Sequence, residues 1–96
     1  MLTENRVSQV GKALGHPARV RILGMLTKQE LCVCQLAPIL SLDPSVVSRH
    51  LQLLARAGLI TSRRDGVRIV WKIADNSVLQ LLDLIREKIA AQGVLG

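Results

Sequence analysis

The chain has 96 residues, 49% of them hydrophobic, and Trp71 is its single aromatic residue. This length fits one domain, residues 1–96, whose aliphatic core favours assembly with a second copy. Thirteen Lys and Arg against seven Asp and Glu give a net charge of +6, which favours nucleic acid as a partner. No apolar run approaches the roughly 20 residues of a membrane span, and no signal-peptide pattern follows Met1. We therefore expect a cytoplasmic protein without a membrane partner.

Apolar residues at helical spacing predict two helices at the start of the chain. The first covers residues 3–15, with Thr3 as its N-cap and Gly15 at its end. Pro17 opens the second, which is largely buried and runs through Thr27.

A third, short helix is predicted within residues 31–40. Because Pro38 falls inside its first turns, we expect the helix to begin at or after Val33 or to be kinked. Its inward-facing residues are predicted to be Leu36, Ile39 and Leu40.

A fourth helix is predicted from Asp43 as N-cap and Pro44 as first residue to about Ala57, with Gly58 in the left-handed position after it. One side of this helix carries hydroxyls, an amide and guanidiniums but no acidic group. Such groups read base edges and phosphates in a DNA major groove, whereas an ordinary solvated face is usually rich in Glu and Lys. His50, at the edge of the apolar side, is expected to pack and to hold the helix by a hydrogen bond. The predicted DNA contacts are Ser45, Ser48, Arg49, Gln52 and Arg56.

Two strand-like runs follow, residues 59–63 and 67–73, joined by Arg64-Asp65-Gly66, a strong hairpin signal. Asp75 or Asn76 then caps a last helix over residues 77–92. This order predicts a mainly α winged helix-turn-helix, with the hairpin as its wing and an added helix at each end. The expected phosphate or minor-groove contacts of the wing are Arg63, Arg64 and Arg68.

The two cysteines, Cys32 and Cys34, lie one residue apart at the start of the third predicted helix. Thiolates suit soft, thiophilic centres, and two close thiols chelate better than one. Residues two apart in a regular helix point about 200° apart, so a chelate requires a non-helical start to this helix. The alternative is a pair of small buried apolar residues, but this spacing cannot bury both on one helix face.

Several segments together resemble the ArsR/SmtB family of bacterial metal-responsive repressors, over roughly residues 5–90. The resemblance implies a homodimer whose first and last helices form the interface, bound to an imperfect palindromic operator and released from it by an inducer. The matching segments are Leu14-Gly15-His16-Pro17-Ala18-Arg19, Glu30-Leu31-Cys32-Val33-Cys34-Gln35-Leu36, Ser45-Val46-Val47-Ser48-Arg49-His50-Leu51, Ala57-Gly58-Leu59-Ile60 and Arg64-Asp65-Gly66.

Within the family, Glu-Leu-Cys-Val-Cys is most similar to the arsenite-responsive branch. The similarity implies that the inducer is As(III) or Sb(III), held by Cys32 and Cys34. The sequence does not distinguish these two from Bi(III). That branch often has a third cysteine where this chain has Ala37, so hydroxide or a small thiol would supply the third ligand. The N-terminal cysteines of the cadmium/lead branch are missing, and the last helix has no histidine for the zinc site of another branch. We expect capture to distort the start of the third helix and to move the DNA-reading helix off its groove.

Three alternatives stay open. A repressor of the same fold could respond to oxidation of the two thiols, because a disulfide across one residue is easily reduced. A small thiol oxidoreductase is disfavoured, since Cys-X-Cys lacks the spacing and setting of thioredoxin-like sites, and we expect no enzyme activity. A DNA-binding architectural protein would have inert cysteines.

Overall fold

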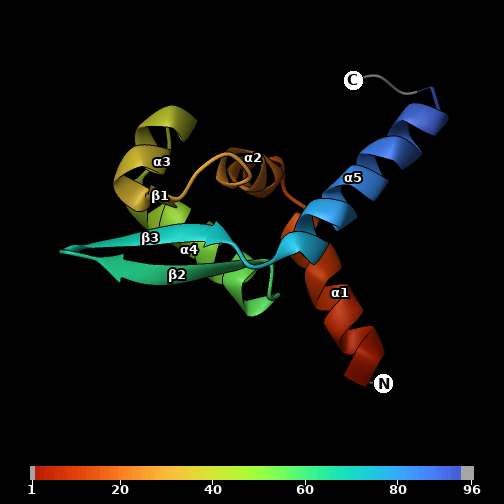
Figure 1. Cartoon of the computed structure of the whole chain (residues 1–96), viewed down its shortest axis with the longest axis horizontal. Helices are drawn as coiled ribbons and strands as arrows, with labels where there is room; N and C mark the ends of the chain where they lie inside the picture. Colours follow the sequence, from red (N-terminus) through yellow and green to blue (C-terminus); the bar gives the residue numbers. More distant parts are fainter. Residues whose placement is uncertain (1, 94–96) are drawn as a thin grey trace.

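The computed structural model describes residues 2–93. Helices α3 and α4 form the helix-turn-helix, the hairpin β2–β3 forms the wing, and α1 and α5 are the added terminal helices, so the predicted winged helix-turn-helix is confirmed (Figure 1). The elements are α1 (Leu2–Leu14), α2 (Pro17–Leu26), β1 (Leu31–Cys32), α3 (Val33–Leu40), α4 (Pro44–Arg56), β2 (Ile60–Asp65), β3 (Arg68–Ile73) and α5 (Asn76–Ala91).

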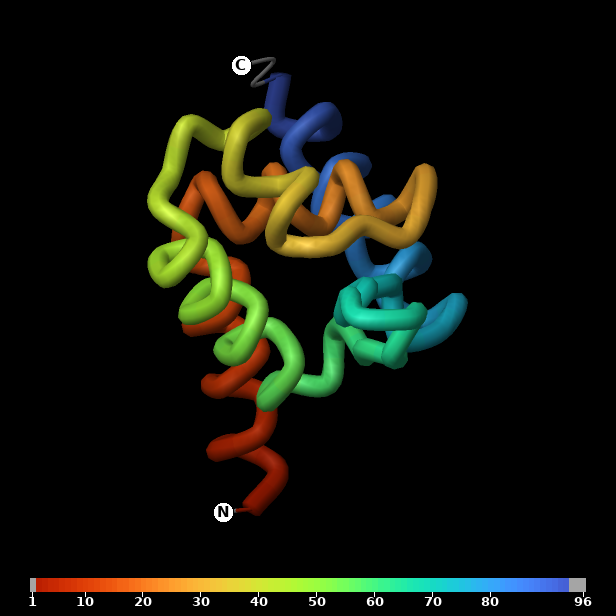
Figure 2. The backbone as a smooth tube through the Cα atoms, turned by 90° about the vertical axis from the view of Figure 1, so that its left-hand side faces the viewer, coloured from red at the N-terminus to blue at the C-terminus, as the bar shows by residue number. Residues whose placement is uncertain are grey.

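The wing and the terminal helices lie at opposite ends of the molecule. Figure 1 shows the hairpin projecting to the left, while α1 and α5 lie at the right and diverge toward the two termini. Figure 2, seen from the wing end, shows α2 and α3 across the top and α4 in front of α1. Among residues 2–93, no helix combines the length and hydrophobicity that crossing a membrane would require.

The core is aliphatic and is centred on α2, α3 and α4. Its fully buried side chains include Ile22, Leu36 and Leu51. One inward-facing residue was predicted wrongly, because Ile39 is 50% exposed and Ala37 is buried instead. Ile39 lies two residues after Ala37, and that spacing places it on the far side of a helix.

The caps of α4 and α5 agree with the sequence signals. Asp43 Oδ1 accepts a hydrogen bond from the Ser45 N–H at 2.8 Å, and Asp75 does the same for Ser77 at the start of α5. Gly58 has a φ of +80° after α4, as predicted. Thr3 is not an N-cap, because α1 already includes Leu2.

The sheet has three antiparallel strands in the order β1-β3-β2. The short strand β1 was not predicted, and it pairs Leu31 with Trp71 and Cys32 with Val70. The hairpin turn also differs from the prediction, because Asp65 still pairs with Arg68 and the loop shifts to residues 66–67. Gly66, at a φ of +65°, provides the left-handed conformation that such a two-residue loop needs.

Candidate dithiol site and DNA interface

The two cysteines lie where β1 passes into α3. Cys32 is the N-cap of α3, with an extended backbone (φ −94°, ψ 167°), and Cys34 is in the first turn of the helix. The expected non-helical start is therefore confirmed, and the two sulfurs are joined in a disulfide with a Cα–Cα distance of 5.2 Å. Because α3 is helical from Val33 onward, the sulfurs meet without any unwinding of the helix.

The backbone of Cys32 is held from two sides. Cys32 pairs with Val70 of β3, and the Cys32 N–H donates a hydrogen bond to Gln35 Oε1 at 3.0 Å. Cys32 is only 3% exposed, whereas Cys34 is exposed. Cys32 is thus held against the sheet, whereas Cys34 lies at the surface.

Within the part of the chain that the structure describes, no third metal-ligating side chain groups with the two cysteines. Residues 2–93 contain no group of three or more His, Cys, Asp and Glu side chains placed to hold a metal ion. The two histidines lie elsewhere and contact each other, with the ring centroids of His16 and His50 4.7 Å apart. Reduced to thiols, Cys32 and Cys34 would supply two sulfur ligands, a donor type that soft, thiophilic centres prefer.

The predicted DNA-reading side of α4 faces solvent. Arg49, Gln52 and Arg56 are exposed and Ser48 is half-buried, while the opposite side of the helix is buried in the core. Ser45 is exposed, but its hydroxyl donates to Asp43 Oδ1 at 2.7 Å. This hydrogen bond is the main reason why the pKa of Asp43 lies below its usual range.

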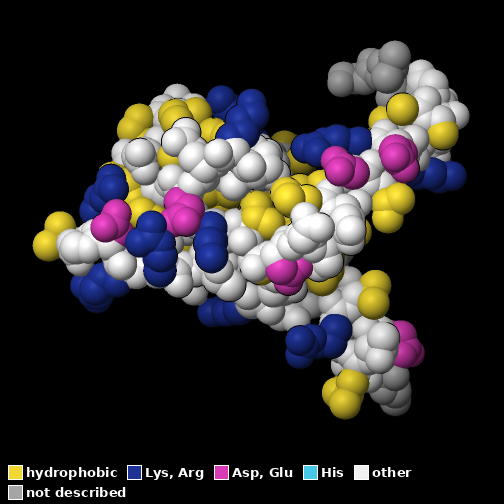
Figure 3. Space-filling model, in the orientation of Figure 1, with side chains coloured by type: hydrophobic (Ala, Val, Ile, Leu, Met, Phe, Trp, Pro, Cys, Tyr) yellow, Lys and Arg dark blue, Asp and Glu magenta, His cyan; other side chains and the backbone are white. Residues whose placement is uncertain are grey.

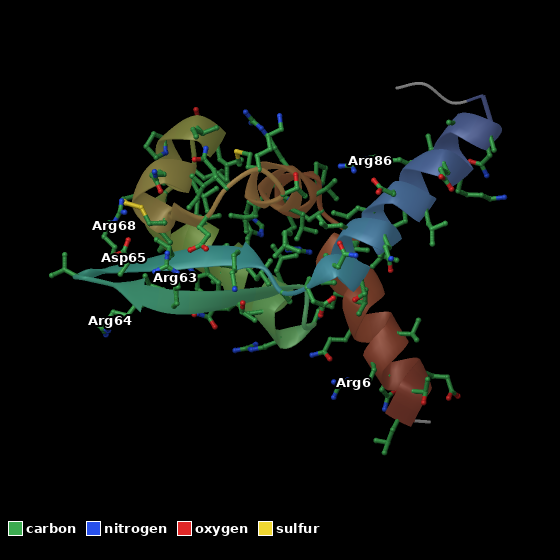
Figure 4. All side chains as sticks on the ribbon, viewed as in Figure 1. Arg6, Arg63, Arg64, Asp65, Arg68 and Arg86 are labelled. Atoms are coloured by element: carbon green, nitrogen blue, oxygen red, sulfur yellow. A yellow bond between two sulfur atoms is a disulfide. The ribbon has the colours of Figure 1, made fainter. Side chains whose placement is uncertain are left out.

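The three wing arginines are exposed but differ in their neighbours. Figure 4 shows Arg68 on the side of the hairpin that faces the disulfide and Arg64 on the opposite side. Arg68 Nη2 lies 3.5 Å from Asp65 Oδ2. Arg63 Nε and Nη2 both lie 2.8 Å from Glu30 Oε1, an ion pair that no local sequence signal indicated. Basic side chains surround the apolar tip of the wing in Figure 3.

A cavity of about 390 Å³ joins the dithiol to the predicted DNA interface. It opens between the start of α3, the exposed side of α4 and the wing, and both cysteines contribute to its wall. The predicted DNA contacts in this wall are Ser48, Gln52 and Arg68. Its remaining lining residues are Val33, Val67, Ile69 and Trp71.

A buried polar cluster fixes α4 from the other side. Arg19, which sequence reasoning did not single out, donates from Nη1 to His50 Nδ1 at 3.1 Å, from Nε to the Ala13 carbonyl at 2.8 Å and from Nη2 to the Lys12 carbonyl at 3.0 Å. A guanidinium can only donate, so His50 Nδ1 is the acceptor and the imidazole is neutral. Burial lowers the pKa of His50, and the charges of His16, Arg19 and Arg49 lower it further. The predicted packing and hydrogen-bonding role of His50 is confirmed.

Comparison with known families gives one clear match. The model of the bacterial regulatory proteins of the arsR family matches residues 16–62. A transcriptional repressor SmtB homolog of Synechocystis sp. is 37% identical over 76 residues, which are 79% of this chain and 58% of that protein. The chain therefore spans little more than half the length of that relative. The regulator MJ1325 of Methanocaldococcus jannaschii is 30% identical over 83 residues, 85% of this chain and 93% of that protein.

Solved structures agree with the sequence relatives. The homodimeric winged helix-turn-helix DNA-binding domain of Mb0332 from Mycobacterium bovis superposes with a TM-score of 0.88 at 31% identity, over 95% of this chain and 84% of that one. A possible transcriptional regulator for arsenical resistance superposes with a TM-score of 0.67 at 31% identity, over 81% and 80% of the two chains. All four of these relatives are described as known or possible transcriptional regulators. The chain belongs to the ArsR/SmtB family of transcriptional regulators.

Proposed function

We propose that this chain is a cytoplasmic, homodimeric repressor that leaves its operator when Cys32 and Cys34 capture As(III) or Sb(III). The observation that carries the proposal is the shared cavity, whose wall contains both cysteines together with Ser48, Gln52 and Arg68. A ligand held by the two sulfurs would occupy the space that adjoins the DNA-reading side chains.

The DNA contacts would come from α4 and the wing. The exposed side of α4 presents hydrogen-bonding groups suited to base edges, and the arginines of β2 and β3 present charge for phosphates. The net charge of +6 supports the same partner. Two protomers would place two copies of α4 on the half-sites of a palindrome.

Exposed apolar side chains on the terminal helices support the dimer. On α5, Leu84 is 63% exposed, and Ile85 and Ile89 are also exposed. On α1, Leu2 and Val7 are exposed. Figure 3 shows hydrophobic side chains at the surface of both terminal helices, away from the wing. A second copy that covered this surface would leave the α4 and wing surface free for DNA.

The inducer chemistry follows from the donor set. Two thiolates select soft centres such as As(III) and Sb(III), and the cavity beside them leaves room for a third, exogenous ligand. We place the response in the cavity rather than in an unwound helix, because the sulfurs already meet with α3 intact. A coupling of about 1–3 kcal/mol would change operator affinity by about 5- to 150-fold.

The disulfide favours one second candidate, a repressor of the same fold that responds to oxidation of Cys32 and Cys34. In that case the reduced and oxidised forms would differ in operator affinity without any metalloid.

The test uses an operator selected from random duplex DNA with the reduced protein. Fluorescence anisotropy then measures operator affinity with and without arsenite for the native chain, Cys32→Ser and Cys34→Ser. The proposal expects weaker binding in arsenite, restored by a dithiol chelator and lost in both variants. If arsenite has no effect while an oxidant weakens binding and a monothiol restores it, the redox candidate replaces the metalloid one. Insensitivity to both would leave a DNA-binding protein with inert cysteines.

A further inference from the structure

The cavity beside the dithiol has a largely apolar wall, which is unexpected if its only task is to hold a hydroxide. Val33, Val67, Ile69 and Trp71 contribute to this wall. We propose that the preferred inducer is arsenic(III) that carries one organic substituent, bound by both sulfurs, with the substituent in the cavity. This inference rests on the proposed function and names the substrate class of the same site.

The number of sulfur ligands matches such a compound. Trivalent arsenic forms three bonds, the chain supplies two sulfurs, and the described residues bring no third metal ligand to them. Inorganic arsenite therefore keeps one hydroxyl in the complex. A monosubstituted arsenical, R–As(OH)2, has two exchangeable hydroxyls and satisfies the site completely.

The exchange balances without any change in the oxidation state of arsenic. A low-molecular-weight thiol first reduces the disulfide, with two of its molecules becoming one disulfide and Cys32 and Cys34 becoming thiols. The two S–H and two As–OH groups then give two As–S bonds and two molecules of water. The As–C bond is retained, and the substituent stays on the arsenic.

The cavity has the size and surface that an organic group needs. It is open to solvent, and Val67 at its rim is almost fully exposed. Its volume of about 390 Å³ nevertheless exceeds that of the enclosed cavity of about 150 Å³ that holds a benzene molecule. A hydroxide on arsenic would leave most of this space to water and would bury none of the apolar wall. A phenyl or alkyl group would bury apolar surface, which is favourable in proportion to the area removed from water.

The same position explains how the substituent would act on DNA binding. Ser48 and Gln52 of α4 and Arg68 of the wing line the cavity that the substituent would fill. A bulky group between α4 and the wing would keep these side chains from their DNA contacts. We therefore expect larger substituents to release the operator at lower occupancy than a hydroxide does.

The test compares phenylarsine oxide, which hydrates to the phenyl compound of this class, with sodium arsenite on the reduced full chain. Trp71 lines the cavity and is the chain's single tryptophan, so its fluorescence reports binding, while anisotropy of a labelled operator reports release. A free Cys-Val-Cys peptide gives the intrinsic preference of an unstructured dithiol for the phenyl compound. We expect the protein to exceed that preference by about tenfold or more, the gain from burying part of one ring.

A matched pair of variants tests where the substituent lies. Ile69→Gln makes the cavity wall polar, and Ile39→Gln makes the same change at an isoleucine of similar exposure that does not line the cavity. We expect Ile69→Gln to remove the extra preference for the phenyl compound while the affinity for arsenite is kept. Ile39→Gln should change neither.

The outcomes separate this inference from the proposed function. If arsenite releases DNA through both cysteines but the phenyl preference only equals that of the peptide, the inference is overturned and the proposed function stands. A preference that survives in Ile69→Gln also overturns the inference, because the cavity would not be its cause. If neither arsenical releases DNA, the proposed function fails and the inference fails with it.

Discussion

Replacement of the buried Arg19 by methionine should destabilise the protein strongly. Arg19 connects the end of α1, through the carbonyls of Lys12 and Ala13, to His50 on α4. Methionine keeps much of the apolar stem but leaves a buried imidazole nitrogen and a helix-end carbonyl without their donors. The bonds to Ala13 and His50 are both buried, and each unsatisfied acceptor costs about 1–3 kcal/mol.

The expected loss is smaller than the sum of those costs. Removal of the guanidinium also removes the cost of keeping a charge away from water, so we expect a net loss of about 2–4 kcal/mol. For a chain of this size such a loss lowers Tm by about 10–25 °C. Urea unfolding followed by circular dichroism, at one protomer concentration for all variants, measures the free energy of unfolding.

The matched control is Arg21→Met, because Arg21 is an exposed arginine on the same helix. Its free energy of unfolding should stay within about 0.5 kcal/mol of the native value. If Arg19→Met costs no more than Arg21→Met, the three hydrogen bonds do not stabilise the fold and the reasoning is refuted.

Three further predictions concern pH, the wing and the dimer. Burial holds the pKa of His50 in the folded chain below its ordinary value of about 6.5. The unfolded chain therefore binds more protons below that pH, so the free energy of unfolding should be complete above pH 6.5 and fall as the pH drops below it. Urea unfolding at pH 7.5 and 5.5 measures this loss, which should be smaller in His50→Gln if His50 is the cause. Glu30→Gln removes the carboxylate that pairs with Arg63 and so frees the guanidinium for a phosphate. The DNA association constant K should then rise at low salt, and the slope of log K against log salt concentration should steepen by about 0.9. An unchanged slope would mean that Arg63 does not contact phosphate. Leu84→Glu places a charge on the exposed apolar side of α5. Sedimentation velocity should then find monomers at micromolar concentrations where we expect the native chain to form the proposed dimer. A variant dimer of native affinity would place the interface elsewhere.

Local signals predicted most of the elements correctly. Asp43-Pro44, Gly58 and Asp75 act within a few residues of their own position, and each has its expected conformation or cap. Helix geometry likewise predicted that Cys32 and Cys34 can be joined only if α3 has a non-helical start, and Cys32 is extended.

The errors arose where distant segments decide the outcome. Strand β1 has two residues, and its pairing partners in β3 lie about 40 positions along the chain. Ile39 was predicted to face the core because it is hydrophobic, but α3 packs with Ala37 buried and Ile39 exposed. In the candidate site, the sequence indicated the cysteines and the polar side of α4 separately. Their meeting in one cavity depends on how α3, α4 and the wing pack, which no local pattern records.

The pairing of β1 with β3 has a consequence for how this protein can evolve. Hydrogen bonds between the two backbones connect the cysteine segment to the wing, and backbone groups are the same for every residue type except proline. A substitution at Cys32 by any residue except proline can therefore change the side-chain chemistry at this position while the backbone pairing with the wing is kept. The side chain at position 32 and the backbone link to the wing depend on different atoms of one residue, so the side chain can vary under selection without loss of the strand pairing.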